Sequence, residues 1–143
     1  MATRADLLTE VLKKKEIYSD FPTNFDSIPG TETLTSITNE NSVITSVKNL
    51  ILTNLGERPF QPTIGSRVYR MLFEIVDQNS VFAIENITNE IRRTIEANEP
   101  RAQLLDVKVS VTPDTHDASV NIIFSVINRI DPIQLNVILK RVR

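Results

Sequence analysis

The sequence predicts an α+β domain, in which two main helices and a short helix pack on a small three-stranded antiparallel sheet behind an N-terminal arm. Two observations support this class. Apolar residues recur at helical spacing through the middle of the chain, and they alternate with polar residues at a period of two toward its C-terminus. We place the extended arm at residues 1–40 and a single α+β domain at residues 41–143.

The first 40 residues contain few apolar side chains. A short amphipathic stretch at residues 7–12 is followed by three lysines at residues 13–15, and the polar segment beyond them has no regular period. The lysine run is typical of a solvated helix end. Because so little apolar surface is available for burial, we expect this arm to be the least ordered part of the isolated chain.

The first helix of the domain is predicted over about residues 42–55. Asn41 or Ser42 can cap its start, and Gly56 stands where a left-handed residue commonly follows a helix. The stripe at helical spacing consists of Val43, Val47, Leu50, Ile51 and Leu55.

A loop with two prolines and two glycines separates this helix from the next two. A short helix is predicted over residues 68–74 and a longer one over residues 80–97. Pro100 stops the longer helix, because a proline ring disfavours the α conformation in the preceding residue. The apolar stripe of the longer helix consists of Val81, Ile84, Ile87, Ile91 and Ile95.

The C-terminal part alternates apolar and polar residues, which is typical of strands with one buried face. Two such runs flank a polar connection and form a predicted hairpin. A third run follows Asp131-Pro132, where a strand is favoured over a short helix. The apolar positions are Leu105, Val107, Val109 and Val111, then Val120, Ile122, Phe124 and Val126, then Ile133, Leu135, Val137 and Leu139.

Composition excludes several kinds of site. The chain has no cysteine and one histidine, so the usual zinc constellations cannot be built. A net charge of −2 provides no long-range attraction to nucleic acid or to an acidic membrane surface. The sequence shows neither a signal peptide nor an apolar span of about twenty residues. We therefore expect no cofactor, no nucleic-acid or membrane partner, and a protein made and used in a cytoplasm. Secretion by an unusual route and release by lysis stay open as alternatives.

No catalytic constellation emerges from the sequence. His116 lies in the predicted hairpin connection without a second histidine or a cysteine to complete a metal site or a triad. A glycosidase needs two carboxylates about 5 to 9.5 Å apart. Sequence spacing does not place Glu57, Glu74 or Glu99 at such distances, so a muramidase stays an alternative to a non-enzymatic function.

Arginines gather in the central part of the chain. A guanidinium is well suited to bidentate recognition of a carboxylate at a protein interface. Each of these arginines is also compatible with a solvated surface charge, which contributes little. The set consists of Arg58, Arg67, Arg70, Arg92, Arg93 and Arg101.

Two motifs together resemble a known family. The segment "NLILTNLGERPFQPTIGSRVYRMLFE" is followed about 25 residues later by "NEPR" and then by the predicted hairpin. This arrangement is similar to the gene-twenty-five-type (gpW-like) family of baseplate wedge proteins and sheath initiators. The family belongs to contractile phage tails and to the baseplates of type VI secretion systems. The resemblance covers the chain from about residue 18 to its C-terminus.

The resemblance implies a structural, non-enzymatic baseplate component of a virion tail, assembled in the host cytoplasm. It would dock on other wedge proteins and initiate polymerisation of the tail sheath, with tail tube or hub proteins as further candidate partners. Glu99, Pro100 and Arg101 would carry wedge docking together with Arg58. An internal pairing of this motif with the "GERPF" loop, through Glu57 and Arg58, is the alternative. Because similar baseplate proteins have been described as lysozymes, the muramidase alternative also stays open.

The last predicted strand is the candidate sheath contact. The resemblance implies that sheath polymerisation starts by strand exchange with a sheath subunit, and an exposed sheet edge offers unpaired backbone N–H and C=O groups for that purpose. Which strand meets the sheath stays open. A basic end such as residues 140–143 is also typical of a protected edge. The candidate sheath-binding residues are Ile133, Leu135, Asn136, Val137 and Leu139.

Overall fold

In the computed structural model the chain forms two compact units, which meet in the sequence between Ser42 and Val43. The amphipathic stretch at residues 7–12, the lysine run at residues 13–15 and His116 lie outside the described residues. The structure describes residues 18–27, 30, 33–74, 81–112, 117–127, 129 and 131–140.

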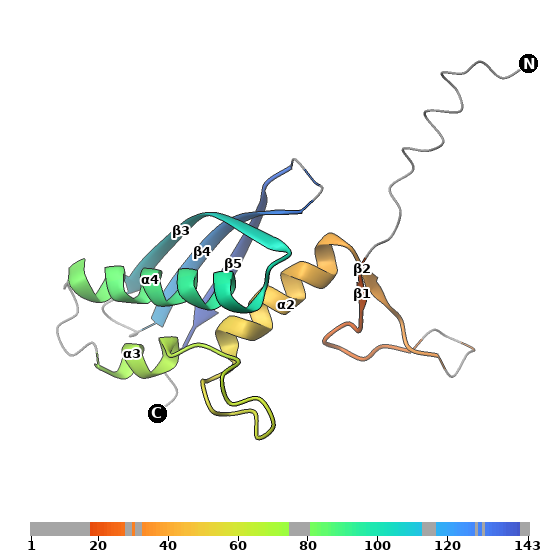
Figure 1. Cartoon of the computed structure of the whole chain (residues 1–143), viewed down its shortest axis with the longest axis horizontal. Coiled ribbons are helices and arrows are strands. Elements are labelled where there is room, and N and C mark those ends of the chain that lie inside the picture. Colours follow the sequence, from red (N-terminus) through yellow and green to blue (C-terminus); the bar gives the residue numbers. More distant parts are fainter. Residues whose placement is uncertain are drawn as a thin grey trace, which may run out of the picture. The chain divides into compact units, whose positions relative to one another are not determined.

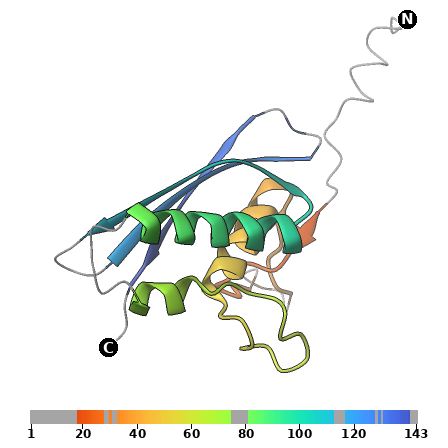
Figure 2. The ribbon, with the colours of Figure 1, turned by 60° about the vertical axis from the view of Figure 1, so that its left-hand side comes forward.

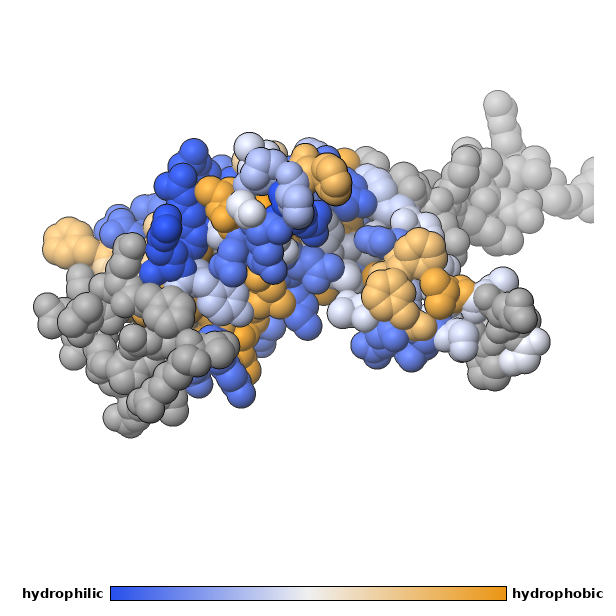
Figure 3. Space-filling view, turned by 90° about the horizontal axis from the view of Figure 1, so that it is seen from below, coloured by the Kyte–Doolittle hydropathy of each residue, from blue (hydrophilic) through white to orange (hydrophobic). Residues whose placement is uncertain are grey.

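The N-terminal unit contains a short pair of antiparallel strands, β1 (Ser19–Asp20) and β2 (Ile37–Thr38). Its described apolar side chains are largely exposed to solvent and gather in one place (Figure 3). They include Phe21, Phe25 and Leu34. The segment predicted to be an arm therefore contains an ordered strand pair with an apolar surface.

The larger unit confirms the predicted α+β class, with three helices packed against a three-stranded antiparallel sheet. Figures 1 and 2 show α4 lying along one face of the sheet. The described helices and strands of this part of the chain are α2 (Glu40–Leu52), α3 (Val68–Glu74), α4 (Val81–Asn98), β3 (Ala102–Thr112), β4 (Asp117–Val126) and β5 (Ile133–Leu139).

The sheet has the strand order β3-β4-β5, so β4 is central and β5 lies at an edge of the described sheet. The third apolar run is a strand and not a short helix, which confirms the favoured prediction. Alternate residues of β4 and β5 are buried, as expected for strands with one face on a core. The core combines the predicted α4 stripe, Ile87, Ile91 and Ile95, with β4 residues such as Val120, Ile122 and Phe124.

A β-bulge in β3 corrects the predicted alternation. The pairing with β4 passes from Leu104↔Phe124 directly to Asp106↔Ile123, so Leu105 is the extra residue. Leu105 was expected on the buried face with Val107, but 53% of it is exposed. A bulge shifts the following residues by one position, which reverses the faces of the strand on either side of it.

The first helix is displaced toward the N-terminus relative to its prediction. It begins at Glu40, so Asn41 and Ser42 lie within the helix and do not cap it. It ends at Leu52, and Leu55 lies in the following loop with 41% of its surface exposed. Gly56 does adopt the expected left-handed conformation, with φ 86°, but within that loop and not directly after the helix.

The other two helices agree with their predictions. α3 has the predicted bounds, and α4 ends at Asn98, one residue beyond the predicted end and two residues before Pro100. The side chain of Val81 lies outside the described residues. Helices α2, α3 and α4 therefore place the "GERPF" loop and the "NEPR" segment on the larger unit.

Candidate docking sites

The "NEPR" segment forms the turn between α4 and β3. The N–H of Glu99 donates to the C=O of Ile95 at 2.8 Å, which continues the helical pattern for one more residue. The N–H of Ala102 donates to the C=O of Glu99 at 3.1 Å and closes the turn around Pro100. The Asn98 side-chain amide donates to the C=O of Thr94 at 2.9 Å. The helix end is thus well bonded, and Pro100 is exposed on it.

The Glu99 carboxylate is the centre of a buried polar cluster. Arg101 donates from Nε to Oε1 at 2.6 Å and from Nη2 to Oε2 at 2.7 Å, which is a bidentate ion pair. The Ser46 hydroxyl of α2 also donates to Oε2. Only 3% of the Glu99 side chain is exposed, against 32% of the Arg101 side chain.

Burial raises the pKa of Glu99, but the hydrogen bonds from Arg101 and Ser46 and the charge of Arg101 outweigh it. The net pKa therefore lies below the ordinary value for a glutamate. Glu99 is ionised at neutral pH despite its burial. The cluster fixes the α4–β3 turn to the middle of α2, 53 positions earlier in the sequence.

The internal partners differ from those considered for the motif. Glu99 and Arg101 bind each other, and Glu99 also accepts from Ser46. The Glu57 carboxylate instead accepts the backbone N–H of Asn54 at 2.8 Å, within its own loop. Ser46 was not singled out from the sequence, because a serine on a helix gives no local sign of a distant carboxylate.

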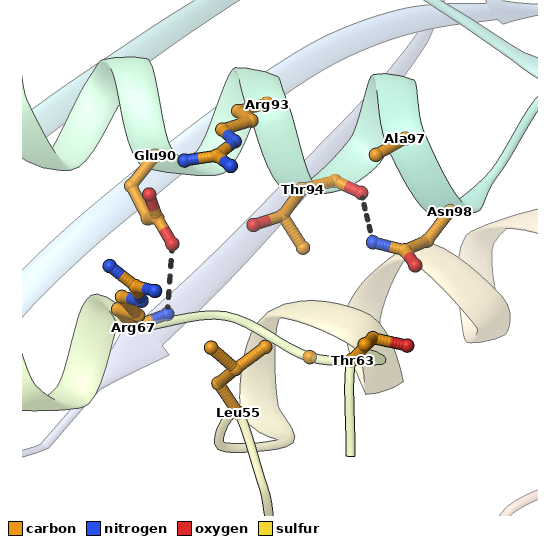
Figure 4. A pocket seen from close by; sticks show the side chains of 9 residues that line it. Leu55, Thr63, Arg67, Glu90, Arg93, Thr94, Ala97 and Asn98 are labelled. Carbon is orange, nitrogen blue, oxygen red and sulfur yellow. Dashed lines mark hydrogen bonds between the residues drawn. The ribbon is translucent and has the colours of Figure 1, made fainter. Parts of the chain in front are cut away.

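Two of the central arginines meet at one hollow beside α4 (Figure 4). Arg67 and Arg93 line this hollow of about 240 Å³, and Glu90 accepts the backbone N–H of Arg67 at 3.2 Å on its wall. Arg70 lines an adjoining hollow together with Arg67. Three arginines and one glutamate, Glu90, line these two hollows, so the surface at the base of the loop after α2 has a net positive charge.

The predicted sheath-binding residues of β5 mostly face the core. Leu135, Val137 and Leu139 are buried, Ile133 is half-buried, and Asn136 is exposed. The buried side chains cannot contact another chain while the domain is folded. Any contact along this strand must therefore use its backbone or the exposed side chains that alternate with the buried ones.

The direction of the backbone groups follows from one hydrogen bond. The N–H of Ile127, directly after β4, donates to the C=O of Arg101, directly before β3, at 3.0 Å. Backbone groups of successive residues in an antiparallel strand point to opposite sides. Counting back from Ile127 in steps of two, the backbone N–H and C=O groups of β4 therefore point toward β3. The backbone groups of the residues between them, such as Ile122 and Val120, point toward β5.

The pairing of β4 with β5 fixes the direction of the backbone groups in β5 as well. Ile122 pairs with Leu135 and Val120 pairs with Val137, so these two β5 residues direct their N–H and C=O groups toward β4. Asn136, between them, directs its N–H and C=O away from β4. No strand of the described part of the chain lies on that side of β5.

Comparison with known proteins decides the family. The sequence model of the family described as baseplate wedge protein gp25 matches residues 38–131. The chain is also 31% identical over 93 residues to baseplate wedge protein gp25 of Enterobacteria phage T4, across 65% of this chain and 68% of that protein. The chain belongs to the gp25 baseplate wedge family.

Two solved structures share the fold of this gp25-family chain. One is a protein described as a candidate tail lysozyme from Geobacter sulfurreducens, with 20% identity, a TM-score of 0.64 and coverage of 73% of this chain and 92% of that one. The other is a chain of the anti-feeding prophage baseplate, with 19% identity, a TM-score of 0.58 and coverage of 88% and 87%. The gp25-family chain is thus a structural baseplate component of a contractile tail.

Among the described residues of this gp25-family protein, no three acidic, histidine or cysteine side chains come together as a metal site would require. None of its described helices combines the length and apolar character needed to cross a bilayer.

Proposed function

We propose that this chain docks on other wedge proteins of a contractile-tail baseplate and serves as the platform on which tail sheath polymerisation begins. Its location would be the tail of the assembled particle, reached from the host cytoplasm, with tail tube or hub proteins as further neighbours. The observation that carries the proposal is the family match over residues 38–131, because it includes both the "GERPF" loop and the "NEPR" turn.

Wedge docking is assigned to Pro100, Arg101 and Arg58, with Glu99 in a supporting role. Pro100 and Arg58 are exposed, and 32% of the Arg101 side chain is exposed while Glu99 holds its guanidinium. A fixed guanidinium loses less conformational entropy when it binds a partner carboxylate than a free one does. Glu99 is thus a positioning residue, and its own carboxylate is occupied within the fold.

Docking can be tested by replacing Arg58 with Glu in particles assembled by the strain that encodes this chain. Arg58 is exposed, and among the described residues no carboxylate forms an ion pair with it, so the isolated Arg58→Glu protein should unfold like the wild type. Its amount per particle should fall, because a reversed charge at an interface opposes association. Arg92→Glu, on exposed α4 surface, is the matched control. If the wild type, Arg58→Glu and Arg92→Glu proteins are incorporated in equal amounts, Arg58 is not part of the docking surface.

Sheath initiation is assigned to the open edge of β5. The outward N–H and C=O of Asn136 can pair with a strand of a sheath subunit, and the alternating buried residues set the register. The neighbouring backbone groups that face β4 hold β5 in its own sheet. This arrangement separates the groups that stabilise the fold from those that would bind sheath.

A proline at Asn136 tests this assignment. Proline removes an N–H that faces away from β4, so the Asn136→Pro protein should stay folded and enter baseplates. Those baseplates should yield tubes without sheath in electron micrographs. Asn136→Thr alters the side chain but keeps the N–H, and it should support normal sheath. Sheath of normal length on Asn136→Pro baseplates would show that another surface is the template.

The fold shared with a candidate tail lysozyme keeps an enzymatic function as the second candidate. A glycosidase general acid needs a raised pKa, so that it is protonated near neutral pH. Glu99 has a lowered pKa and is buried, and Glu57 is engaged by the N–H of Asn54. The side chain of Glu74 lies outside the described residues. We therefore propose that the chain is not an enzyme.

A lytic assay separates these two functions. Purified chain should release no soluble fragments from peptidoglycan, with a muramidase as the positive control. Lysis that disappears in a folded Glu57→Gln or Glu74→Gln variant would identify a catalytic carboxylate and contradict the structural function.

A further inference from the structure

Phe60 stands at the end of the loop between α2 and α3, and 98% of it is exposed to solvent. The loop projects away from the helices and the sheet (Figure 1), and the surface of the larger unit on this side is mostly hydrophilic (Figure 3). A single exposed apolar residue is common on protein surfaces. What distinguishes Phe60 is the structure that holds it there.

The neck of this loop is closed by backbone hydrogen bonds. The N–H of Leu55 donates to the C=O of Ser66 at 3.0 Å, and the N–H of Ser66 donates to the C=O of Thr53 at 2.9 Å. Farther out, the N–H of Gly56 donates to the C=O of Pro62 at 2.9 Å. The two sides of the loop are thus joined at successive levels, which gives it a defined shape.

The tip of the loop is a four-residue turn. The N–H of Gln61 donates to the C=O of Arg58 at 3.2 Å, so Pro59 and Phe60 occupy the two central positions. Proline suits the first central position of a turn, because its ring fixes φ near the value required there. The position of Phe60 is therefore set by backbone hydrogen bonds of its own loop, and its side chain does not pack against the rest of the chain.

The charges around Phe60 are predominantly positive. Arg58 belongs to the same turn, and Arg67 and Arg70 are exposed at the base of the loop. Among the described residues, no carboxylate lies within ion-pair distance of these three guanidinium groups. The nearby Glu57 carboxylate is bound to the N–H of Asn54 at 2.8 Å. On a chain of net charge −2, this is a local positive surface.

We propose that Phe60 inserts into an apolar socket bordered by carboxylates on a neighbouring baseplate protein, with Arg58 paired to that acidic border. This inference rests on the proposed docking function and specifies the chemistry of the partner surface. Aromatic and arginine side chains are enriched at the centres of protein interfaces. A preformed loop also loses little conformational entropy when it binds.

A second copy of this chain would be a poor partner. Arg67, Arg93 and Arg70 line the hollow beside α4 and the one adjoining it, against a single carboxylate, Glu90. A docking Phe60 would therefore bring Arg58 against a surface of predominantly like charge. Complementarity of charge therefore favours a different protein with an acidic surface.

The partner can be identified by placing the photoreactive residue p-benzoylphenylalanine at position 60 and, as a control, at position 82. Phe82 is also well exposed, at 76%, but lies on α4 away from the loop tip. Whole tail particles from the encoding strain are irradiated and the cross-linked peptides are sequenced. We expect position 60 to join one other baseplate protein at apolar residues flanked by Asp or Glu, and position 82 not to join that site.

Variants of the same positions measure the contribution of the contact. With limiting expression, Phe60→Ala should lower the chain's affinity for baseplates by about 30-fold, as expected for an aromatic residue at the centre of an interface, whereas Phe82→Ala should not. Both isolated variants should unfold like the wild type.

The outcomes separate this inference from the proposed function. If the wild-type chain is absent from particles, both fail. If the wild type is present but position 60 joins only its own chain, lipid or nothing, or if Phe60→Ala enters particles normally, the loop is not an anchor, although docking elsewhere stands.

Discussion

Removal of Arg101 should destabilise the isolated domain, because it would leave a buried carboxylate without its cation. Breaking one side of a buried ion pair costs about 3 to 5 kcal/mol, whereas an exposed pair contributes less than about 1 kcal/mol. Glu99 is almost fully buried, but about a third of the Arg101 side chain is exposed. We therefore expect Arg101→Ala to lower the free energy of unfolding by about 2 kcal/mol, between those limits.

The assay is urea unfolding at pH 7, with thermal unfolding as a second measurement. A loss of about 2 kcal/mol corresponds to a Tm lowered by roughly 6 °C for a chain of this size. Arg101→Lys keeps the charge but loses the bidentate geometry, so its loss should be intermediate. Arg92→Ala, at an exposed position on α4, should change the free energy of unfolding by less than about 0.5 kcal/mol.

The pH dependence identifies Glu99 as the group responsible. Its pKa in the folded state is lowered, so its contribution is complete above the unfolded pKa of about 4.3 and is lost as the pH falls through the lower folded value. In Arg101→Ala, burial without the arginine should raise that pKa. The stability difference between the two proteins should therefore be large at pH 7 and shrink toward pH 3.

Ser46 provides a further check, because its hydroxyl donates to the same carboxylate. Ser46→Ala should cost about 1.5 kcal/mol, and the double variant with Arg101→Ala should deviate from additivity, since both side chains act on one group. Wild-type stability in Arg101→Ala at pH 7, or a stability difference that is the same at pH 3, would refute the buried-pair argument.

Two further predictions concern the backbone. Gly65→Ala should cost more than about 2 kcal/mol in urea unfolding, because its φ is 131° and an added Cβ would lie 2.7 Å from the C=O oxygen of Thr53; unchanged stability would show that the loop neck adjusts. Leu105→Lys should change the free energy of unfolding by less than about 0.5 kcal/mol, whereas Val107→Lys, on the buried face, should prevent cooperative unfolding measured by circular dichroism; equal effects would contradict the bulge.

Local sequence patterns were sufficient for much of the fold. The stripe through Ile87, Ile91 and Ile95 predicted a helix that ends before Pro100, and the structure places it at Val81–Asn98. The alternation from Ile133 to Leu139 predicted a strand with one buried face, which is β5. These predictions succeeded because the periods of 3.6 and 2 residues are properties of neighbouring residues, and the resemblance carried by "GERPF" and "NEPR" likewise lies in short segments.

Tertiary structure decided the features that join distant segments. The single-residue shift at Leu105 depends on how β3 pairs with β4. Two consecutive leucines, Leu104 and Leu105, interrupt the alternation there, but only the pairing decides which of them is the extra residue. The partner of Glu99 on α2 is Ser46, at a separation of 53 positions that no local pattern encodes. The outward direction of the Asn136 backbone follows from the hydrogen bond between Ile127 and Arg101 and the pairing of three strands. The sequence by itself thus determined the helices and strands of the larger unit and most of the faces they bury, but not the β1–β2 pair or the face of β3 at Leu105. Contacts between elements determined where the charged and backbone groups point, because those directions depend on register and packing across the whole unit.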